Sequence, residues 1–148
     1  AAKYLIALLR DGNNLNVRRS ASDARAAFET YSHLLSDKER AQYDITLHAA
    51  KARTPEAYAV VSTLYADQPE LRTEAFGKEM FKSNPNVALY ILQVRLKSQG
   101  VYNGPLNGYA TNTTLSAVYK ACIKSLPDEW CDDNVMRPDV IGALLAQR

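Results

Sequence analysis

Apolar residues recur at intervals of three and four positions along almost the whole chain, and this spacing constrains the fold more than any other feature. One such run consists of Ala24, Ala27, Phe28, Tyr31, Leu34 and Leu35. Residues 57–65 and 115–126 contain similar runs. Such spacing places apolar side chains on one face of an α-helix. No run shows the sustained alternation of a strand bounded by turn residues. The sequence therefore predicts an all-α protein.

Capping residues and prolines indicate where the helices begin. Ser36 and Glu39 have the spacing of a capping box, and Thr54-Pro55 and Asn84-Pro85 each place a capping residue before a proline. The polar segment 11–20 is predicted to be a loop. Together these signals predict helices over residues 1–10, 21–35, 37–51, 55–66, 69–82, 86–99, 112–126 and 138–146.

The tripeptide Ser83-Asn84-Pro85 is the expected domain boundary, because it ends one helix and caps the next. Short connections between the preceding helices favour a helical bundle or stacked helical hairpins over residues 1–84. Residues 85–148 are predicted to form a small three-helix domain.

The charge balance excludes some classes of function. The chain has 18 Lys and Arg against 16 Asp and Glu, a formal net charge of +2, which argues against a dedicated nucleic-acid binder. Apolar stretches such as residues 4–9 are far shorter than the roughly 20 residues that a membrane-spanning helix needs. We expect neither a membrane span nor a signal peptide within the chain.

Two cysteines, Cys122 and Cys131, lie close together in the sequence and flank a segment containing Pro127. Two thiols are too few for a four-ligand zinc site, and His33 and His48 are far from them in the sequence. We expect both histidines to be partly buried structural residues on helices. The favoured interpretation is a disulfide, which would place the chain in the periplasm or outside the cell. The alternative is a pair of buried thiols that pack as small apolar groups.

No motif for catalysis is apparent. The chain has no His-Glu-x-x-His pair, no glycine-rich phosphate loop and no Gly-x-Ser-x-Gly elbow. We therefore predict a protein that is not an enzyme and has no cofactor and no metal. The carboxylates around Trp130 are either simply solvated or a weak calcium contact, and Trp130 either packs over the disulfide or anchors a partner. These carboxylates are Asp128, Glu129, Asp132 and Asp133.

Residues 92–118 read LQVRLKSQGVYNGPLNGYATNTTLSAV. This segment resembles the peptidoglycan-binding domain that is often attached to bacterial cell-wall hydrolases, and the resemblance extends over about residues 86–146. That family has a helix with Leu-Gln and Leu, a glycine stop, an aromatic residue, a glycine, an Asp-Gly turn, and a second helix with Thr and Ala-Val. The matching positions here are Leu92-Gln93, Leu96, Gly100, Tyr102, Gly104, Asn107-Gly108, Thr114 and Ala117-Val118.

The chain departs from this pattern at several points. Ala110 and Thr111 replace a Phe-Gly pair, Ala121 and Cys122 replace Phe-Gln, and the turn Asp is Asn107. Residues 127–138 form an unusual insert. The fold is expected to be retained, whereas these changes fall where ligand recognition would occur.

The resemblance implies a ligand site on the glycine-rich bends between Gln99 and Thr114. Such loops expose peptide groups beside aromatic and amide side chains, which suits a peptide or a sugar. The expected ligand-binding residues are Tyr102, Asn103, Asn107, Tyr109, Asn112 and Thr113. The alternative is a structural role, in which Tyr102 packs into the core and the polar residues form turns, with Asn112 capping a helix.

These observations lead to one main hypothesis and two rivals. The main hypothesis is a non-catalytic periplasmic protein that binds or anchors to peptidoglycan, either its stem peptide or its glycan, while the N-terminal helices dock an envelope protein partner. The first rival is a degenerate wall-binding fold used as a protein–protein interaction module. The second is the binding portion of a longer cell-wall hydrolase.

A second, weaker resemblance lies in residues 34–44, which read LLSDKERAQYD. They are similar to the final helices of a J-domain, a family that acts on Hsp70-type partners through a His-Pro-Asp loop. Here the corresponding positions near Arg10-Asp11-Gly12 lack His and Pro, so co-chaperone activity is not predicted. The alternative interpretation is that Ser36-Asp37 caps a helix whose solvated face packs Tyr43 inward.

Overall fold

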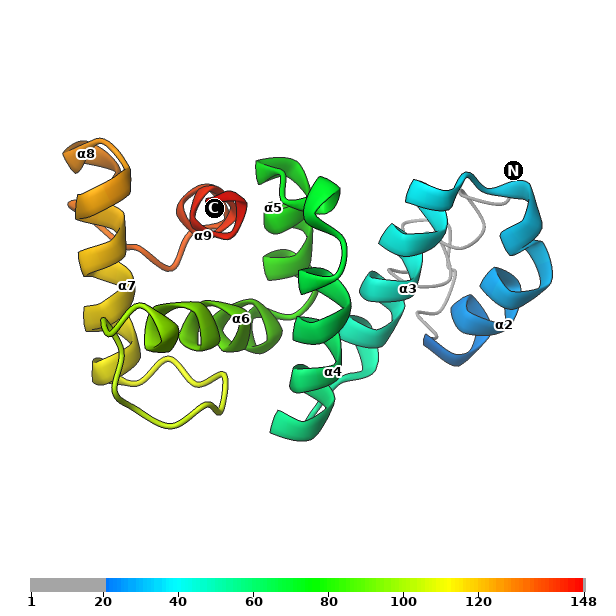
Figure 1. The fold of residues 1–148 in the computed structure, drawn as a ribbon, viewed down its shortest axis with the longest axis horizontal. Coiled ribbons are helices and arrows are strands. Elements are labelled where there is room, and N and C mark those ends of the chain that lie inside the picture. Colours follow the sequence, from blue (N-terminus) through cyan, green and yellow to red (C-terminus); the bar gives the residue numbers. More distant parts are fainter. Residues whose placement is uncertain (1–20, 148) are drawn as a thin grey trace. The chain divides into compact units, whose positions relative to one another are not determined.

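The chain is all-α, as predicted from the periodicity. The computed structural model describes residues 21–147, and no strand occurs among them (Figure 1). The helix predicted over residues 1–10 and the loop predicted over residues 11–20 lie outside the described residues. The described helices are α2 (Ala21–Tyr31), η1 (Ser32–Leu34), α3 (Asp37–Lys51), α4 (Pro55–Ala66), η2 (Pro69–Leu71), α5 (Glu74–Ser83), α6 (Pro85–Ser98), α7 (Asn112–Ser125), α8 (Asp128–Cys131) and α9 (Pro138–Ala146).

The chain divides into two compact units, residues 1–51 and residues 52–148. The boundary predicted after residue 84 therefore falls inside the second unit. Asn84 is buried there, and its side-chain amide donates to the carbonyl of Ala52 over 3.0 Å. Asn84 and Pro85 do separate two helices, α5 and α6. However, these two helices pack against each other within the second unit, so the end of α5 is not a domain boundary.

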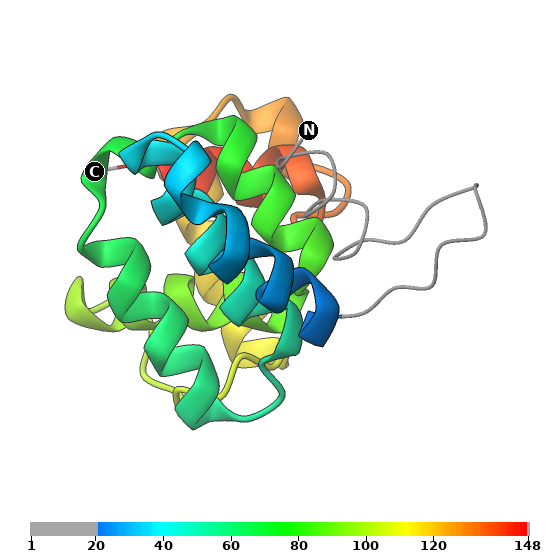
Figure 2. The ribbon, with the colours of Figure 1, turned by 90° about the vertical axis from the view of Figure 1, so that its right-hand side faces the viewer.

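The described part of the first unit is a helical hairpin of α2 and α3 (Figure 2). Its core joins Phe28 of α2 to Leu35 and Leu47, and the ring of Phe28 packs 6.5 Å from that of Tyr43. The predicted capping box is present. The backbone N–H of Ser36 donates to the Glu39 carboxylate, and the N–H of Glu39 donates to the Ser36 hydroxyl.

The two histidines differ in their surroundings. His48 is half-buried, and its Nδ1 lies 2.8 Å from one guanidinium nitrogen of Arg25. The other terminal nitrogen of Arg25 lies 3.0 Å from the Asp44 carboxylate. His33 is exposed in η1, so the prediction that it is a partly buried structural residue is wrong. The helical periodicity placed it beside core positions, but the tighter 3₁₀ turn changes the direction in which side chains point.

The second unit follows the predicted helices closely, with two differences. The helix predicted over residues 69–82 is two elements, because Thr73 adopts an extended conformation and its hydroxyl caps α5 by accepting from the Phe76 N–H. Pro69 begins only the short η2 turn. The four-residue helix α8 was not predicted, since so short an element carries no periodicity.

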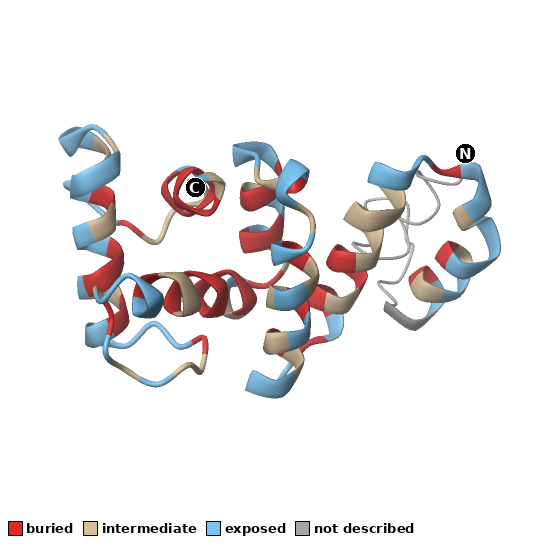
Figure 3. Ribbon diagram, in the orientation of Figure 1, coloured by how far each residue is buried: buried red, intermediate tan, exposed pale blue. Residues whose placement is uncertain are grey.

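Helices α5 and α9 cross at a pair of glycines. A methyl group placed on Gly77 would lie 2.9 Å from the Cα of Gly142, so neither position has room for a side chain. This close approach buries nearly all of α9, and α6 is buried along most of its length (Figure 3). These buried helices support α7 and the loop before it.

Candidate functional site

The loop between α6 and α7 begins at a well-formed helix end. Gly100 follows the last turn of α6 with φ at +76°, a left-handed conformation that glycine adopts at little cost. Its N–H donates to the carbonyl of Lys97, and the N–H of Val101 donates to that of Leu96. These two bonds satisfy carbonyls at the end of the helix and turn the chain away from its axis.

The side chain of Gln93 organises the rest of the loop. It is 1% exposed, and its Oε1 accepts from the backbone N–H groups of Asn107 and Gly108 at 3.0 and 2.8 Å. Its Nε2 donates to the Thr114 hydroxyl at 3.0 Å, at the start of α7. A single buried amide on α6 therefore fixes both the turn and the first turn of the next helix.

Gly108 lets the loop approach the beginning of α6. Its φ is +75°, and a Cβ atom there would lie 2.5 Å from the carbonyl oxygen of Asn86. The Asn86 amide donates to the Gly108 carbonyl over 2.9 Å. The inner side of the loop is thus filled by hydrogen bonds within the chain.

Two of the predicted ligand-binding residues have internal partners. Tyr102 is 1% exposed, and its hydroxyl donates to the Pro105 carbonyl at 2.5 Å, which is the alternative core packing considered from the sequence. The carboxamide oxygen of Asn107 accepts from the Tyr109 N–H at 3.0 Å and from Gln93 at 3.3 Å. These groups hold the loop together.

The other four predicted residues are exposed: Asn103, Tyr109, Asn112 and Thr113. Asn103 precedes the turn, whereas Asn112 and Thr113 begin α7. The cap of α7 is Thr111, whose hydroxyl accepts from the Thr114 N–H, and not Asn112 as considered from the sequence. Of the six predicted residues, only Asn103 lines a groove at the C-terminal ends of α6 and α7.

That groove has a volume of about 840 Å³. It lies between the C-terminal half of α6, the segment after it, the C-terminal half of α7 and the end of α9. Its lining combines aliphatic side chains, amides and three cations, and contains no carboxylate. The main lining residues are Leu92, Arg95, Leu96, Gln99, Val101, Asn103, Lys120, Lys124, Leu144 and Gln147.

The three cations of the groove are held differently. The guanidinium of Arg95 is committed to the end of α9, where it donates to the carbonyls of Leu144 at 2.8 Å and Leu145 at 3.2 Å. Burial, and then the nearby charge of Arg72, lowers the pKa of Arg95 from its usual value. Lys120 and Lys124 are exposed and form no ion pair with any residue in the described part of the chain.

Lys120 and Lys124 are not among the site residues predicted from the sequence. Lys120 and Lys124 are spaced i and i+4, which places them on one face of a helix. That spacing is also typical of an ordinary solvated face, so the sequence contained no signal that a groove lies beside them. The groove arises only where α6, α7 and the end of α9 meet.

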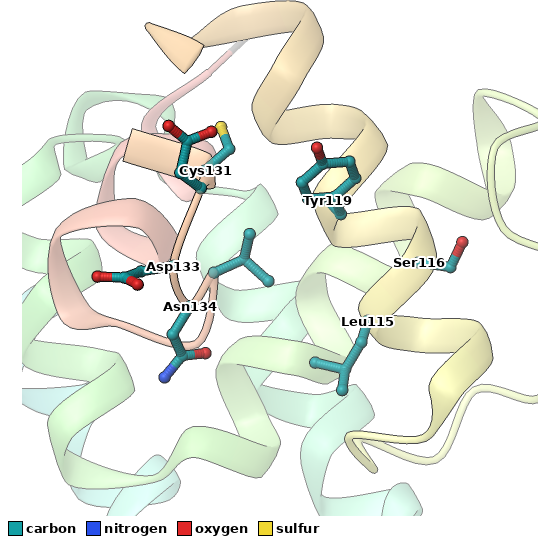
Figure 4. A pocket seen from close by; sticks show the side chains of 8 residues that line it. Leu115, Ser116, Tyr119, Cys131, Asp133 and Asn134 are labelled. Carbon is teal, nitrogen blue, oxygen red and sulfur yellow. The ribbon is translucent and has the colours of Figure 1, made fainter. Parts of the chain in front are cut away.

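A smaller hollow of about 390 Å³ lies on the other flank of α7. Figure 4 shows Leu115 and Tyr119 on α7, with Cys131 and Asn134 across the hollow from them. Cys131 forms the predicted disulfide with Cys122, with the two Cα atoms 6.0 Å apart. The bridge joins α7 to α8 and so positions the wall of the hollow opposite α7. Trp130, beside Cys131, is half-buried.

Among the described residues, no group of three or more His, Cys, Asp or Glu side chains is arranged to hold a metal ion. None of the described helices has the length and apolar character required to cross a membrane. The disulfide is compatible with an extracytoplasmic location, because such bonds persist in oxidising compartments.

Comparisons of the chain with protein-family models, curated proteins and solved structures gave no match.

Proposed function

We propose that this protein is a non-catalytic binding protein of the bacterial cell envelope, and that its groove holds the peptide stem of peptidoglycan. The observation that carries the proposal is the groove itself, with cations and amides on its rim, aliphatic walls and no carboxylate. The resemblance of residues 86–146 to wall-binding domains supports the choice of ligand.

The charge of the groove suits an acidic ligand. Lys120 and Lys124 project from adjacent turns of α7, and no described residue neutralises them. A peptide stem carries free carboxylates, which such ammonium groups bind by charge-assisted hydrogen bonds. The amides of Gln99 and Asn103 can bond peptide groups of the same ligand.

The size and walls of the groove suit a short peptide. Pockets for small ligands have volumes of roughly 300–1,000 Å³, and the 840 Å³ of the groove falls within that range. Leu92, Leu96 and Leu144 supply apolar wall against which methyl-bearing side chains of a stem peptide can pack.

This proposal moves the site from the loop to the groove beside it. The polar groups of Asn107 and Tyr102 are already bonded within the chain, so a ligand would have to displace those bonds. Lys120 and Lys124 have no such bonds to lose. The disulfide supports a periplasmic or secreted location, where the wall is accessible.

Co-sedimentation with purified peptidoglycan sacculi tests the proposal. Lys120→Gln with Lys124→Gln is expected to weaken binding about tenfold, because two exposed charge pairs are lost. The matched control is Lys38→Gln with Lys51→Gln, which removes the same charge from the exposed face of α3. Equal binding by both double variants, or no binding by the folded parent protein at low salt, would refute the proposal.

A second variant distinguishes the groove from the loop. Tyr109 is 55% exposed and does not line the groove, so Tyr109→Ser should bind sacculi as the parent protein does. If Tyr109→Ser loses binding while the double lysine variant retains it, the ligand site is on the loop, as the sequence analysis predicted.

A further inference from the structure

The flank of α7 that faces away from the groove carries an apolar stripe. Leu115, Tyr119 and Ile123 follow one another at intervals of four residues, so they share a helix face. Tyr119 is 48% exposed and Ile123 40% exposed. Lys120 and Lys124 occupy a different face of the same helix. The two flanks of α7 therefore present different chemistry.

The hollow beside this stripe has an apolar interior and an acidic rim. Leu115, Tyr119 and Val135 line it together with Asp132 and Asp133 (Figure 4). Figure 4 shows Asp133 on the side opposite α7, beyond the chain that carries Asn134. Asp132 and Asp133 thus belong to the wall of the hollow that lies across from α7.

The acidic charge is not neutralised within the described residues. Asp132 and Asp133 form no ion pair there, and neither do Asp128 and Glu129 in the adjoining α8. Uncompensated carboxylates that border an exposed apolar hollow are complementary to a basic segment carrying an apolar side chain. A metal ion is a poorer match, since the described residues contain no group of three metal-ligating side chains.

We infer that this hollow docks a partner protein through a basic segment that inserts one aliphatic or aromatic side chain between Tyr119 and Val135. The apolar side chain is desolvated against the stripe, and the flanking Lys or Arg residues pair with Asp132 and Asp133. This inference does not depend on the wall-binding proposal, because it uses the opposite flank of α7.

The disulfide makes the hollow a fixed feature of the second unit. Cys131 contributes to its lining, and its bond to Cys122 holds the end of α8 beside α7. The following segment is held in turn by Arg137, whose Nε donates to the Asn134 carbonyl over 2.8 Å. A partner would therefore meet a preorganised surface, which lowers the entropy lost on binding.

The test uses a fluorescent hexapeptide with two lysines on each side of a leucine–phenylalanine pair, and measures its binding to the full chain by anisotropy. Asp132→Asn with Asp133→Asn is expected to weaken binding about tenfold, and higher salt to weaken it further. The matched control is Asp67→Asn with Glu70→Gln, two exposed acids elsewhere in the second unit, which should bind the peptide as the parent does.

The apolar contribution is tested separately. Tyr119→Ser should weaken binding of the hexapeptide at least about fivefold, because an exposed ring face is lost, whereas Tyr109→Ser should not. A peptide with two serines in place of the leucine–phenylalanine pair should bind several-fold more weakly than the parent peptide. Equal binding of both peptides would overturn the inference, since it would reduce the contact to charge alone.

A second copy of this chain is the competing occupant, because the basic groove of one molecule is complementary to the acidic hollow of another. Sedimentation velocity distinguishes the two occupants. Concentration-dependent association that is abolished both by the double lysine variant and by the double aspartate variant would overturn the inference of a distinct partner. The inference is supported if the parent protein is a monomer that binds the hexapeptide and if the double aspartate variant does not bind it. Sacculus binding by the same aspartate variant tests the wall-binding proposal independently, because that variant leaves the groove unchanged.

Discussion

The loop between α6 and α7 and the exposed flanks of α7 carry similar polar side chains but use them in opposite ways. In the loop, the carboxamide of Asn107 and the hydroxyl of Tyr102 bond to the chain itself, around the buried amide of Gln93. On α7, Lys120 and Lys124 form no such bonds with the residues that the structure describes. Polar residues near the turn thus hold the loop together, whereas the two lysines leave their ammonium groups exposed beside the groove.

The difference has an energetic reason. A buried N–H or carbonyl must find a partner, because leaving it unpaired costs roughly 1–3 kcal/mol. An exposed ammonium group without a partner in the protein costs almost no free energy, since water solvates it. Substitutions in the loop interior should therefore lower the free energy of unfolding, whereas those on the flanks of α7 should change binding and leave stability nearly constant.

The largest effect is expected at Gln93. Gln93→Leu preserves most of the side-chain volume but leaves the N–H groups of Asn107 and Gly108 without their acceptor. We expect the free energy of unfolding to fall by about 4 kcal/mol, the cost of two unsatisfied buried donors. Urea denaturation measures this. Gln99→Leu, an exposed position six residues later, is the control and should change stability by less than about 0.5 kcal/mol. Similar values for the two variants would contradict the role of Gln93.

The disulfide is expected to contribute somewhat less. Replacing both Cys122 and Cys131 by alanine opens a loop with a sequence separation of nine, and chain entropy predicts a loss of about 2.5 kcal/mol. The midpoint of thermal unfolding, with and without reductant, measures the loss. The alanine variant should be insensitive to reductant, and unchanged stability in the parent protein after full reduction would contradict the prediction.

The cap of α7 gives a smaller and more local effect. Thr111→Val removes the hydroxyl that accepts from the Thr114 N–H, and is expected to cost about 1 kcal/mol. Thr113→Val changes the same kind of residue two positions later, where no capping bond forms, and should cost less than about 0.5 kcal/mol. Chemical denaturation of the two variants compares them directly. A larger loss in Thr113→Val would mean that the helix begins differently.

The smallest effect is expected for an exposed ion pair between α5 and α9. The Lys78 ammonium lies 2.8 Å from the Asp139 carboxylate. A hydrogen bond from Lys78, reinforced by its charge, lowers the pKa of Asp139 below its ordinary value of 3.8. Because the folded-state pKa is the lower one, this contribution is complete above about pH 4 and disappears as the pH falls through the folded-state pKa.

Asp139→Asn checks this pair. The variant should lose slightly in stability at pH 7 and match the parent protein at the lowest pH at which both remain folded, as measured by thermal unfolding across a pH series. High salt should reduce the difference, because both groups are exposed. A difference that stays constant from neutral to low pH would exclude the ion pair as its cause.

Local sequence signals predicted most of the helices. Helices α3, α4 and α9 begin and end where periodicity, capping residues and prolines indicated. The prediction was wrong in joining η2 to α5. The sequence did not indicate that the Thr73 hydroxyl accepts from the Phe76 N–H and so caps a new helix. The disulfide, favoured over a pair of buried thiols because the two cysteines are close in sequence and too few for a zinc site, is confirmed.

The candidate site was only partly predictable. Asn103, which lines the groove, is among the predicted residues, but Lys120 and Lys124 are not. Tyr102 was also predicted to bind a ligand, and it lies in the core. Turn-forming residues and ligand-binding residues are drawn from the same amino acids, so a sequence pattern alone does not separate their roles.

What the sequence determined by itself was local: the all-α class, the positions of most helix ends and the pairing of Cys122 with Cys131. These depend on interactions between residues a few positions apart, and the linear order contains that information. Only the tertiary structure decided that Gln93 occupies the interior of the loop, that Gly77 meets Gly142, and that α7 lies between a groove lined by lysines and a hollow lined by aspartates. The physical reason is that burial and partner choice depend on which distant segments pack together, and that packing is fixed by the whole core.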